Sequence, residues 1–579
     1  MRANAEHVQL SFSIVTRWTR IALVCAAAIV GVATVAQLAQ DGTVDIQLLA
    51  INDFHGALEP AAGGVGRIAS RDAGGVEYLS AHLARLKATN SNTVIVAAGD
   101  NIGGTPLLSS LFHDEPTIEA LSLAGVQLSA LGNHDLDEGW WELYRIQKGG
   151  ACHPVDGCQD GTPFSGASFS YLAANVMLDP QKADPQFVKL AGVEGTTPRL
   201  LLPAYAIREV GGVRVGFIGL ILQSAPTVIV PASIRGLTFR PEAEAANEAA
   251  RALRDQGVRA IVVLMHQGGE QRSGDINGCD RISPALVELV TRMTDDIDIV
   301  VSGHSHQAYN CTIDGKLVTS ASSAGRVITD IDLRVQRSNG DVVAKGARNV
   351  VVTRDVEKDA AQTALIARYL PIAEKVGNRV VGTITSSLTR QPSAAGEFPL
   401  GNVVADAFLE AATAPGAGAE LAFTNPGSFR ADVIARDSTG PSPVTYAQLF
   451  SVLPFGNEVI VKSLSGDVLV EVLEQQFGGD RTRIVQVSHG FTFAYNADRP
   501  RGQRIDRSSV RINGMPLDPA RPYRVATNSF LWTGGDGLTA LERGTDPVTV
   551  GVDVDVVASY VERHSPLSPA PLGRIRRVR

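Results

Sequence analysis

Five short polar clusters follow hydrophobic runs in the first half of the chain. They are Asp53-Phe-His55, Gly99-Asp100-Asn101, Gly132-Asn133-His134-Asp135, His266 and Gly303-His304-Ser-His306. Carboxylates, neutral imidazoles and an asparagine carbonyl are ligands for divalent metal ions, and two ions about 3.5 to 4 Å apart suit in-line attack on a phosphorus centre. The residue types therefore predict paired metal ions and phosphoester chemistry.

The clusters differ in how specific they are. Asp53 and His55 lie on the same side of an extended segment, but a lone pair of this kind is more often a surface pair. The Gly-Asp-Asn sequence around Asp100 is commonly only a turn. His304 and His306, two residues apart after a hydrophobic run, have few structural uses. The prediction of a metal centre therefore depends on all five clusters together.

The elements that must position these residues form a repeating pattern from residue 44 to about 355. Apolar runs alternate with glycine-rich loops and helical segments. The expected strands are 44–51, 93–98, 213–220, 260–265 and 297–301, and the expected helices are 77–87 and 241–256. Runs that are apolar on both faces are typical of strands covered on both sides, which predicts a layered α/β domain. Ligands bind beyond the strand ends in such sheets, where all five clusters lie.

A second pattern begins near residue 380 and mixes a helix at 402–411 with short strands and loops rich in Gly and Pro. Residues 357–376 resemble one helix, with a kink expected at Pro371, and we interpret it as the connector. The alternative is an ordinary layer helix of the first domain. The expected divisions are 1–40, 41–356, 357–378 and 379–579.

Length and charge limit the classes of function. A chain of 579 residues exceeds what one hydrophobic core usually organises, so two domains are expected. The formal net charge of -8 does not favour nucleic-acid polymers as partners. The only strongly basic stretch is at the C-terminus, where we expect a solvated tail containing Arg574, Arg576, Arg577 and Arg579.

The first forty residues have the pattern of an export signal. Arg17 and Arg20 precede an apolar run at 21–36, which is short for a membrane span. We predict a signal peptide or, if it is not cleaved, an N-terminal anchor that would be the chain's membrane contact. The protein is accordingly expected outside the cytoplasm: extracellular, periplasmic or on the cell surface.

The cysteines support export independently. Without Cys25, which lies in the N-terminal segment, an even set remains: Cys152, Cys158, Cys279 and Cys311. Four cysteines allow three connectivities. We predict the pairs Cys152–Cys158 and Cys279–Cys311.

The order of the clusters resembles that of the calcineurin-like metallophosphoesterases. Their flanking residues, Asn52-Asp-Phe-His-Gly56 and Leu131-Gly-Asn-His-Asp-Leu-Asp137, are similar to those of the secreted 5'-nucleotidase family. The resemblance extends over roughly residues 44–549. It implies an α/β fold, in which two packed sheets flanked by helices form the metallophosphoesterase domain. A linker helix would join it to a smaller mixed α/β substrate-binding domain.

The resemblance also implies two divalent metal ions and assigns their ligands. One ion would be held by Asp53, His55 and His306, and the other by Asn133, His266 and His304, with Asp100 as a bridge. A hydroxide bridging the metals would attack phosphorus. The ligand types suit Zn, Mn, Fe or Co, with Mg also open, and they do not identify the metal.

Two neighbours of the ligands would assist the reaction. His134 resembles the family's catalytic histidine, which stabilises the departing oxygen, and Asp137 would orient it. Five other histidines lack such a context and are expected to be surface or structural residues: His82, His113, His153, His489 and His564.

The second half resembles the family's phosphate-binding loop at residues 424–430. The resemblance implies that Arg430 pairs with the phosphate and that Asn425 binds polar groups of the substrate. Pro426 and Ser428 replace two family glycines, and an ion pair at the rim is the alternative role of Arg430.

Another position departs from the family. Many members have an arginine where this chain has Ala394. Arg390 is expected to replace it if the loop at 391–396 folds back.

Two further segments resemble the family's base-binding elements. Phe455 and Phe530 would sandwich a nucleobase, while Asp536 and Asn457 would bind ribose hydroxyls. Such aromatic residues are ordinarily core residues. The glycines beside Phe455 and Asp536 favour the binding role because they allow close backbone approach.

The resemblance implies hydrolysis of nucleoside 5'-monophosphates to nucleoside and phosphate, with a small-molecule nucleotide as the partner. Alternatives on the same chemistry are 2',3'-cyclic nucleotide phosphodiesterase with 3'-nucleotidase activity, UDP-sugar hydrolase, NAD pyrophosphatase, or hydrolysis of simple phosphate esters. A non-catalytic binding or adhesin module is a further alternative, against which the seven apt ligand residues argue. The oligomeric state stays open.

Overall fold

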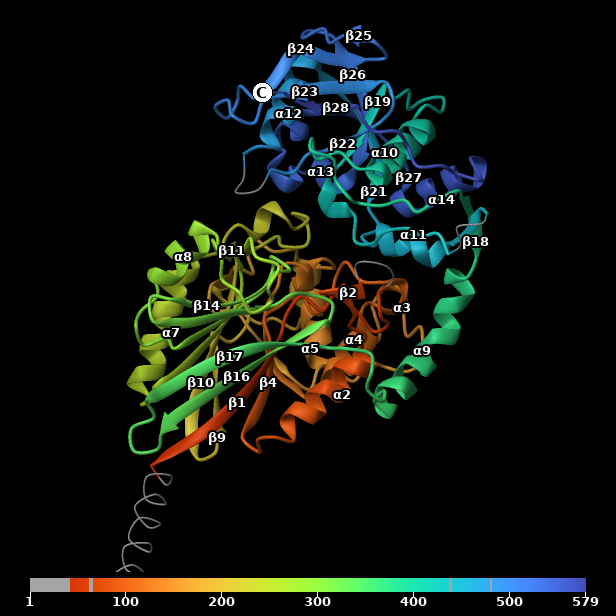
Figure 1. Cartoon of the computed structure of the whole chain (residues 1–579). Helices are drawn as coiled ribbons and strands as arrows, with labels where there is room; N and C mark the ends of the chain where they lie inside the picture. The colour runs from red at the N-terminus through yellow and green to blue at the C-terminus, as the bar shows by residue number, and fades with distance from the viewer. Residues whose placement is uncertain (1–41, 62–65, 437–439, 479–481, 579) are drawn as a thin grey trace, which may run out of the picture.

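The structure, a computed structural model, describes residues 42–61, 66–436, 440–478 and 482–578. Two globular parts are joined along one side by α9 (Ala360–Gly377), with the first part below and the second above in Figure 1. The predicted signal segment at 1–40 lies outside the described residues. Within them, no helix combines the length and the apolar character needed to cross a membrane.

The first part contains two six-stranded sheets. The strands of the first sheet, in spatial order, are β17 (Val342–Val351), β16 (Val327–Gln336), β1 (Thr43–Ile51), β4 (Thr93–Ala97), β5 (Val126–Ala130) and β6 (Ser170–Leu172). Those of the second are β14 (Ala308–Ile313), β15 (Lys316–Ala321), β13 (Ile299–Ser302), β12 (Ala260–His266), β10 (Val213–Ile221) and β9 (Tyr205–Val210). The two predicted sheets are therefore present.

A layer of aliphatic and aromatic side chains packs between the sheets. It includes Leu48, Val96, Phe217, Val262 and Val301, which are fully buried. Burying each such side chain stabilises the fold by about 1.5 to 3 kcal/mol. The outer faces are covered by helices, α2 (Val76–Lys87), α4 (Glu115–Leu123) and α5 (Trp140–Lys148) on the first sheet and α7 (Glu242–Asp255) and α8 (Pro284–Thr291) on the second. The predicted flanking helices are confirmed.

Parallel pairing brings the carboxyl ends of the strands together. β1 pairs with β4 and β4 with β5 in the first sheet, and β10 pairs with β12 and β12 with β13 in the second. All these pairs are parallel, so within each sheet the segments that follow the strands emerge at the same edge. The five predicted strands and helices 77–87 and 241–256 agree with the structure to within two residues.

The helix α9 contacts both parts. It packs on α2 and α4, where Gln362 Nε2 donates a hydrogen bond of 2.8 Å to the carbonyl of Ala120. It also contacts α11 (Tyr446–Val452) of the second part. The helix continues through Pro371. The helix contacts the first part, as a layer helix would, and the second part, as a connector would. The role of connector therefore stays a prediction.

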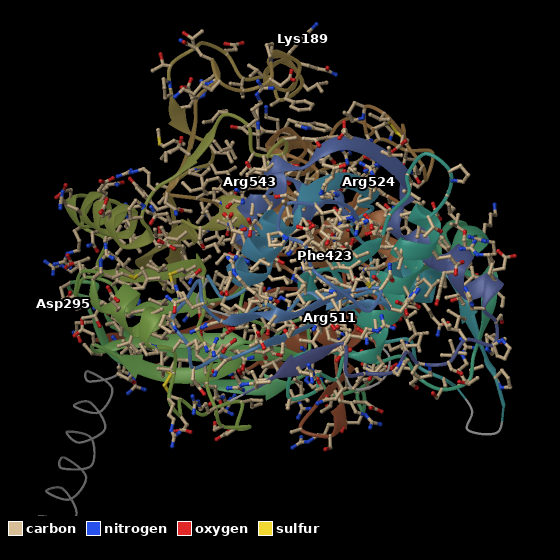
Figure 2. The ribbon with its side chains drawn as sticks, turned by 90° about the horizontal axis from the view of Figure 1, so that it is seen from above. Lys189, Asp295, Phe423, Arg511, Arg524 and Arg543 are labelled. Carbon is tan, nitrogen blue, oxygen red and sulfur yellow. A yellow bond between two sulfur atoms is a disulfide. The ribbon has the colours of Figure 1, made fainter. Side chains whose placement is uncertain are left out.

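The second part is a smaller mixed α/β unit. Its five-stranded sheet has the order β22 (Gln486–Val487), β19 (Leu421–Thr424), β26 (Pro522–Asn528), β21 (Glu458–Ser465) and β27 (Thr545–Val552). Helices α10 (Pro399–Ala412), α11 and α14 (Asp553–Arg563) pack in one core, and α12 (Gly466–Gln475) in another. Seen from above, the buried Phe423 of β19 lies near the middle of the molecule, and the exposed Lys189 and Asp295 lie at its edges (Figure 2).

The C-terminal arginines correct one expectation. Residues Ile575–Arg577 form β28, which pairs with β23 (Phe491–Tyr495). Arg574 forms two hydrogen bonds with the Asp406 carboxylate, at 2.7 and 2.8 Å, on the buried face of α10. The prediction of a solvated tail was wrong for Arg574, because a carboxylate in α10, about 170 positions earlier, supplies a bidentate partner. Arg576 and Arg577 are exposed, as predicted, and Arg579 lies outside the described residues.

Candidate active site

The five polar clusters converge beyond the carboxyl ends of both sheets. Four of them begin within three residues of a strand end, and His266 is the last residue of β12. Five of the predicted ligands have left-handed backbones: Asp53 (φ 50°), His55 (47°), Asp100 (50°), His304 (67°) and His306 (56°). This conformation costs a non-glycine residue roughly 1 to 2 kcal/mol, and such residues concentrate at functional sites. The surrounding fold therefore stabilises these backbone conformations, which are unfavourable by themselves.

Two glycines of the clusters allow their loops to touch. A Cβ atom at Gly132 would lie 2.2 Å from the backbone nitrogen of Asp100, and one at Gly99 would lie 2.7 Å from Nδ1 of His266. Neither distance is sterically allowed. The loops after β4 and β5, and the end of β12, can approach this closely only because these positions lack side chains.

Asp135 ties two of these loops together. Its Oδ2 accepts hydrogen bonds from the backbone N–H of Gly132 (2.7 Å) and Asp100 (3.1 Å), and its Oδ1 accepts them from Asn101 (3.1 Å) and Ile102 (3.3 Å). No role was expected for Asp135 from the sequence. Its place directly after Gly-Asn-His was the available signal, but its partners become visible only when the loops are brought together.

The first predicted ligand group is assembled in the structure. Nε2 of His306 lies 3.2 Å from Oδ1 of Asp53 and also 3.2 Å from Nε2 of His55. The other ring nitrogen of His55, Nδ1, lies 2.8 Å from the carbonyl oxygen of Gly103 and donates to it. Nε2 of His55 then carries a lone pair that faces another imidazole nitrogen. A shared cation would satisfy both nitrogens and the carboxylate.

The second group shows the same arrangement. Nδ1 of His266 lies 2.7 Å from the carbonyl of Ala98 and donates to it, so Nε2 carries a lone pair. That Nε2 is fully buried 3.0 Å from Oδ2 of Asp100, yet it makes no hydrogen bond within the described part of the chain. Nδ1 of His304 lies 3.0 Å from the side-chain oxygen of Asn133. Together these residues fit a metal ion.

Asp100 lies between the two groups. Its Oδ2 is 3.0 Å from Nε2 of His266 in one group and 3.6 Å from Nε2 of His55 in the other. Burial opposes ionisation of Asp100, but the imidazoles of His266, His134 and His55 hold its pKa well below the usual value. Burial also lowers the pKa of His55 and of His304 well below the usual range. Burial opposes protonation of His266, but the carboxylates of Asp100 and Asp53 raise its pKa to about 9. The site thus combines a charged carboxylate with imidazoles at His55 and His304 that favour the neutral, metal-binding form, while His266 would release a proton when a metal binds.

His134 lies beside the metal-ligand groups and points toward the second part of the chain. Its Nδ1 is 2.8 Å from Oδ2 of Asp137, and its backbone N–H donates to Oδ1 of Asp100 at 2.8 Å. Nδ1 therefore carries the proton, and Nε2 is left as an acceptor. Nη2 of Arg430 donates to that Nε2 at 2.5 Å. Arg430 belongs to the second part, so this contact joins the two halves of the site.

A cavity of about 190 Å³ begins at this contact. His134, Asn133 and His304 line it from the first part, and Arg430, Phe455 and Phe530 line it from the second. The ring of Phe455 stacks on His134 with centroids 5.4 Å apart. All the predicted substrate residues except Arg390 line this cavity, namely Asn425, Arg430, Phe455, Asn457, Phe530 and Asp536. Their roles stay predictions.

Arg430 is electrostatically suited to an anion. Its Cζ lies 5.1 Å from the centroid of Phe455, and its Nε is buried without a hydrogen-bond partner among the described residues. Burial lowers the pKa of Arg430 from its usual value. A phosphate oxygen would satisfy the unpaired donor and offset the cost of burying the charge.

Asp536 is held at the far side of the cavity. Its Oδ2 accepts a hydrogen bond of 2.8 Å from Asn425, and its Oδ1 lies 3.6 Å from Nη1 of Arg483. Arg483 lines the same cavity and was not predicted from the sequence. It lies in a loop without a recognisable motif, so the sequence carried no signal for it.

Arg390, predicted to bind substrate in place of the family's arginine, does not line this cavity. It donates to Oδ1 of Asp432 at 3.1 Å and to the carbonyl of Phe429 at 2.9 Å. It lines a second cavity, of about 880 Å³, together with His55, His306 and Arg326. The second cavity therefore adjoins the first ligand group, and Arg430 lines both cavities.

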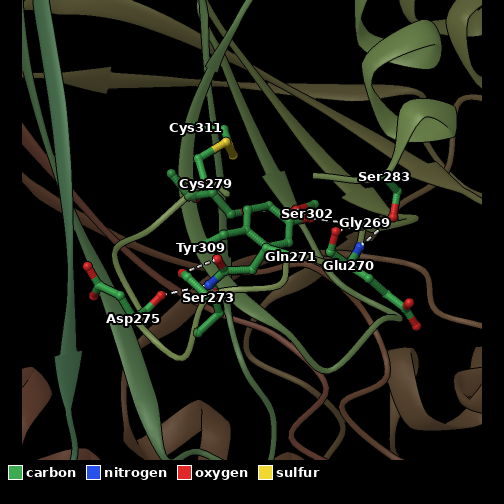
Figure 3. The surroundings of a disulfide bond; sticks show 12 residues. Gly269, Glu270, Gln271, Ser273, Asp275, Cys279, Ser283, Ser302, Tyr309 and Cys311 are labelled. Atoms are coloured by element: carbon green, nitrogen blue, oxygen red, sulfur yellow. Dashed lines mark hydrogen bonds between the residues drawn. A yellow bond between two sulfur atoms is a disulfide. The ribbon is translucent and has the colours of Figure 1, made fainter. Parts of the chain in front are cut away.

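Both predicted disulfides are present, and one supports the site. Cys279 is bonded to Cys311, and Cys152 to Cys158. Near the first bond, the buried hydroxyl of Tyr309 lies 2.7 Å from Oγ of Ser302, at the end of β13, and accepts the N–H of Gly269 at 3.1 Å (Figure 3). The bond and Tyr309 thus connect β14 to the segments that follow His266 and precede His304.

Comparisons with known proteins bear on the chemistry of this arrangement. Residues 46–308 match the calcineurin-like phosphoesterase family, and residues 380–543 match the 5'-nucleotidase C-terminal domain. A cell wall protein of Listeria monocytogenes, Lmo0130, is 30% identical over 558 residues, with 91% of this chain and 68% of that protein aligned. The chain belongs to the 5'-nucleotidase family. As a member, it is a metal-dependent phosphoester hydrolase of the nucleotide-hydrolysing type.

Other relatives of this 5'-nucleotidase family member span different lengths. Endonuclease YhcR of Bacillus subtilis is 31% identical over 552 residues, which cover 93% of this chain but only 41% of YhcR. The crystal structure of a 5'-nucleotidase precursor from Thermus thermophilus aligns with a TM-score of 0.74 at 25% identity, covering 92% of this chain and 99% of that one. The predicted two-domain α/β fold is confirmed by this likeness.

Proposed function

We propose that the protein hydrolyses nucleoside 5'-monophosphates to nucleoside and phosphate. The observation that carries this proposal is the meeting of His134 and Arg430 at one end of a cavity whose other walls include Phe455 and Phe530. A phosphate placed between His134 and Arg430 would adjoin the metal-ligand groups. Its nucleoside would then extend toward the two aromatic rings.

We further propose that the residues hold two divalent ions. Asp53, His55 and His306 would bind one, and Asn133, His266 and His304 the other, with Asp100 shared between them. Divalent ions bound there would supply Lewis acidity and neutralise phosphate charge. The mixed nitrogen and oxygen ligands suit Zn, Mn, Fe or Co.

His134 is proposed to stabilise the transferring phosphoryl group and the departing oxygen. The Nδ1–H group of His134 donates a hydrogen bond to Asp137, which leaves Nε2 free for any proton movement at the cavity. Phosphate binding would separate His134 from Arg430, because phosphoryl oxygens would accept the hydrogen bonds that Arg430 now donates to the imidazole. Arg430 would therefore bind phosphate, and Asn425 and Asp536 would contact the sugar.

The second cavity favours one additional candidate reaction. It is large, it adjoins His55 and His306, and two of its lining residues are Arg326 and Arg390. A substrate with a pyrophosphate bond, such as a UDP-sugar or NAD, could place its second half there while its nucleoside occupies the aromatic cavity. Hydrolysis of that bond is the second proposed activity.

We propose export for the mature protein. Its two disulfides are typical of oxidising compartments, in agreement with the export pattern expected for residues 1–40.

One substrate panel tests these proposals together. Purified protein supplied with Mn²⁺ or Zn²⁺ is assayed on AMP, UMP, cyclic AMP isomers, UDP-glucose, NAD, an aliphatic phosphate ester and single-stranded DNA. We expect the highest kcat/KM on a 5'-monophosphate and no activity after chelation. Equal rates on the aliphatic ester would contradict base recognition. Preferred cleavage of the polymer, an activity that the name of YhcR assigns to that relative, would overturn the proposal.

A further inference from the structure

A second cluster of metal-ligand side chains lies outside the candidate active site. It contains His113, His153, Glu138 and Asp156, two imidazoles and two carboxylates contributed by three separate segments. We propose that this cluster binds one further divalent transition-metal ion, through Nδ1 of His113, Nε2 of His153 and Oε2 of Glu138. The site is independent of the proposed nucleotide hydrolysis.

The ligand atoms are already close to the spacing that an ion needs. Oε2 of Glu138 lies 2.8 Å from Nδ1 of His113 and 3.8 Å from Nε2 of His153. Ligands 2.0 to 2.2 Å from a tetrahedral zinc ion are roughly 3.3 to 3.6 Å apart, which falls between these two distances. The two rings are stacked, with centroids 3.5 Å apart and planes inclined by 13°. Binding requires only that the rings turn out of this stack until both lone pairs converge on the ion.

Asp156 supplies the outer contacts that such a site needs. Its Oδ2 lies 2.9 Å from Nε2 of His113 and 3.6 Å from Nδ1 of His153, the nitrogens that face away from Glu138. A carboxylate that accepts these two N–H groups would fix each ring with its other nitrogen free to bind metal. At present, Nδ1 of His153 accepts a hydrogen bond of 3.3 Å from the backbone N–H of Asp156. In the metal-bound form, a hydrogen bond from Nδ1–H to the Asp156 carboxylate would replace it.

The covalent framework preorganises half of the cluster. The disulfide between Cys152 and Cys158 encloses His153 and Asp156 in one short loop. The loop is closed again by the hydrogen bond of 2.9 Å from the N–H of Gly157 to the carbonyl of His153. A loop restrained in this way loses less conformational entropy when it binds an ion.

The local charge favours a cation. Glu138 and Asp156 face the rings directly, and Glu142 lies behind them, paired with Arg145. Burial opposes protonation of His113, but Glu138, Glu142 and Asp156 raise its pKa above the usual value. Burial and the neighbouring His113 lower the pKa of His153 to about 4. Near neutral pH the pair therefore carries at most one positive charge, in the place where a dication would carry two.

The cluster lies next to residues that support the candidate active site. Glu138 directly follows Asp137, which orients His134. His113 has a left-handed backbone (φ 52°) and precedes Asp114, whose carboxylate accepts the N–H of Gly103 at 3.0 Å. The carbonyl of Gly103 in turn accepts a hydrogen bond from Nδ1–H of His55. An ion in the cluster would hold these loops in place, so its loss should reduce thermal stability more than turnover.

The test counts metal ions in the full-length protein. Protein dialysed against micromolar Zn²⁺ and then against metal-free buffer is measured by elemental analysis, as wild type and as His153→Gln. The exposed His489, which pairs with Asp406 far from this cluster, gives the matched control His489→Gln. We expect about one ion fewer per chain in His153→Gln and an unchanged count in His489→Gln. Zinc should also raise the Tm of His153→Gln by less than it raises the Tm of the wild type.

A second background separates this site from the active site. In the triple variant Asp53→Ala, Asp100→Ala and His266→Ala, which removes a proposed ligand from each active-site group, the remaining tightly bound ion should be the one in this cluster. Co²⁺ bound there should give the visible absorption of a four-coordinate nitrogen and oxygen site. Glu138→Gln should abolish that absorption. Equal metal content in wild type, His153→Gln and Glu138→Gln, or binding only at millimolar Zn²⁺, would overturn the proposal. Neither result depends on which substrate is hydrolysed.

Discussion

The residues on the metal side of the site come from the ends of buried strands, whereas those on the substrate side come from short helices and loops of the second part. Five metal-side residues have left-handed backbones and are tied by Asp135 and by cluster glycines. Among the predicted residues of the substrate side, only Asp536 has such a backbone (φ 57°). The difference indicates that the proposed metal ligands are preorganised by the fold, while the proposed substrate residues lie on surfaces that can be varied independently.

The two sides meet at few contacts. Arg430 reaches His134, and Phe455 stacks on the same imidazole and approaches Gly104, where an added Cβ would lie 3.0 Å from the ring. A change that affects chemistry alone and a change that affects recognition alone should therefore be separable by kinetics.

The largest expected effect is on the metal side. His134→Ala should lower kcat by about 10² to 10⁴, equally for AMP and for an aliphatic phosphate ester, because it removes a group that acts on the phosphoryl centre. Metal content by elemental analysis should be unchanged. A loss restricted to AMP would assign His134 to recognition and would break the comparison.

The next effect comes from the contact between the two sides. Arg430→Ala should lower kcat/KM by roughly 10- to 100-fold for both substrates, since a charge-assisted hydrogen bond contributes about 1.5 to 3 kcal/mol. Steady-state kinetics on the two substrates measure it. Arg483→Ala, on the same cavity but beside Asp536, is the matched control and should affect AMP alone.

A smaller effect is expected for the aromatic residues. Phe530→Ala should raise KM for AMP about tenfold, because stacking on a base contributes roughly 1 to 3 kcal/mol, and it should leave the aliphatic ester within twofold. Competitive inhibition by free adenosine should weaken in parallel. If KM rose equally for both substrates, Phe530 would be supporting the fold of the cavity rather than binding a base.

The last effect is on stability rather than on turnover, and it is a titration beneath the substrate side. Burial raises the pKa of Asp553, at the start of α14, to about 7. The folded state therefore holds this proton more tightly than the unfolded state, whose pKa is about 3.9, and stability falls as pH rises through that interval. Asp553→Asn removes the titration. Denaturant titrations give the free energy of unfolding of the variant and of the wild type. The difference, variant minus wild type, should increase between pH 4 and 7 by at most about 1.4 kcal/mol per pH unit. A difference in unfolding free energy that does not depend on pH would contradict the raised pKa of Asp553.

Much of the fold could be predicted from the sequence. Strand β1 and helix α7 were recognisable because burial on both faces, or on one helical face, imposes a period on apolar residues. Helix α10 begins three residues before the expected start, at Phe398-Pro399, since proline is well accommodated in the first helical turn.

The misses share one physical cause. Asp135, Arg483 and Arg574 take their partners from segments distant in sequence, so nothing local distinguishes them from ordinary surface charges. Long-range packing also brings His113 and His153 together. The sequence predicts both as surface or structural residues, and only folding stacks them between two carboxylates.

By itself, the sequence determined the ligand types and their order along the chain, because metal chemistry restricts which side chains can serve and strand ends restrict where they can stand. Only the tertiary structure decided that Asp100 lies within reach of both ligand groups, that Arg430 meets His134, and that Arg390 faces the other cavity. Those relations depend on how two sheets and a second part pack together. Packing is a property of the whole chain, which no local motif encodes.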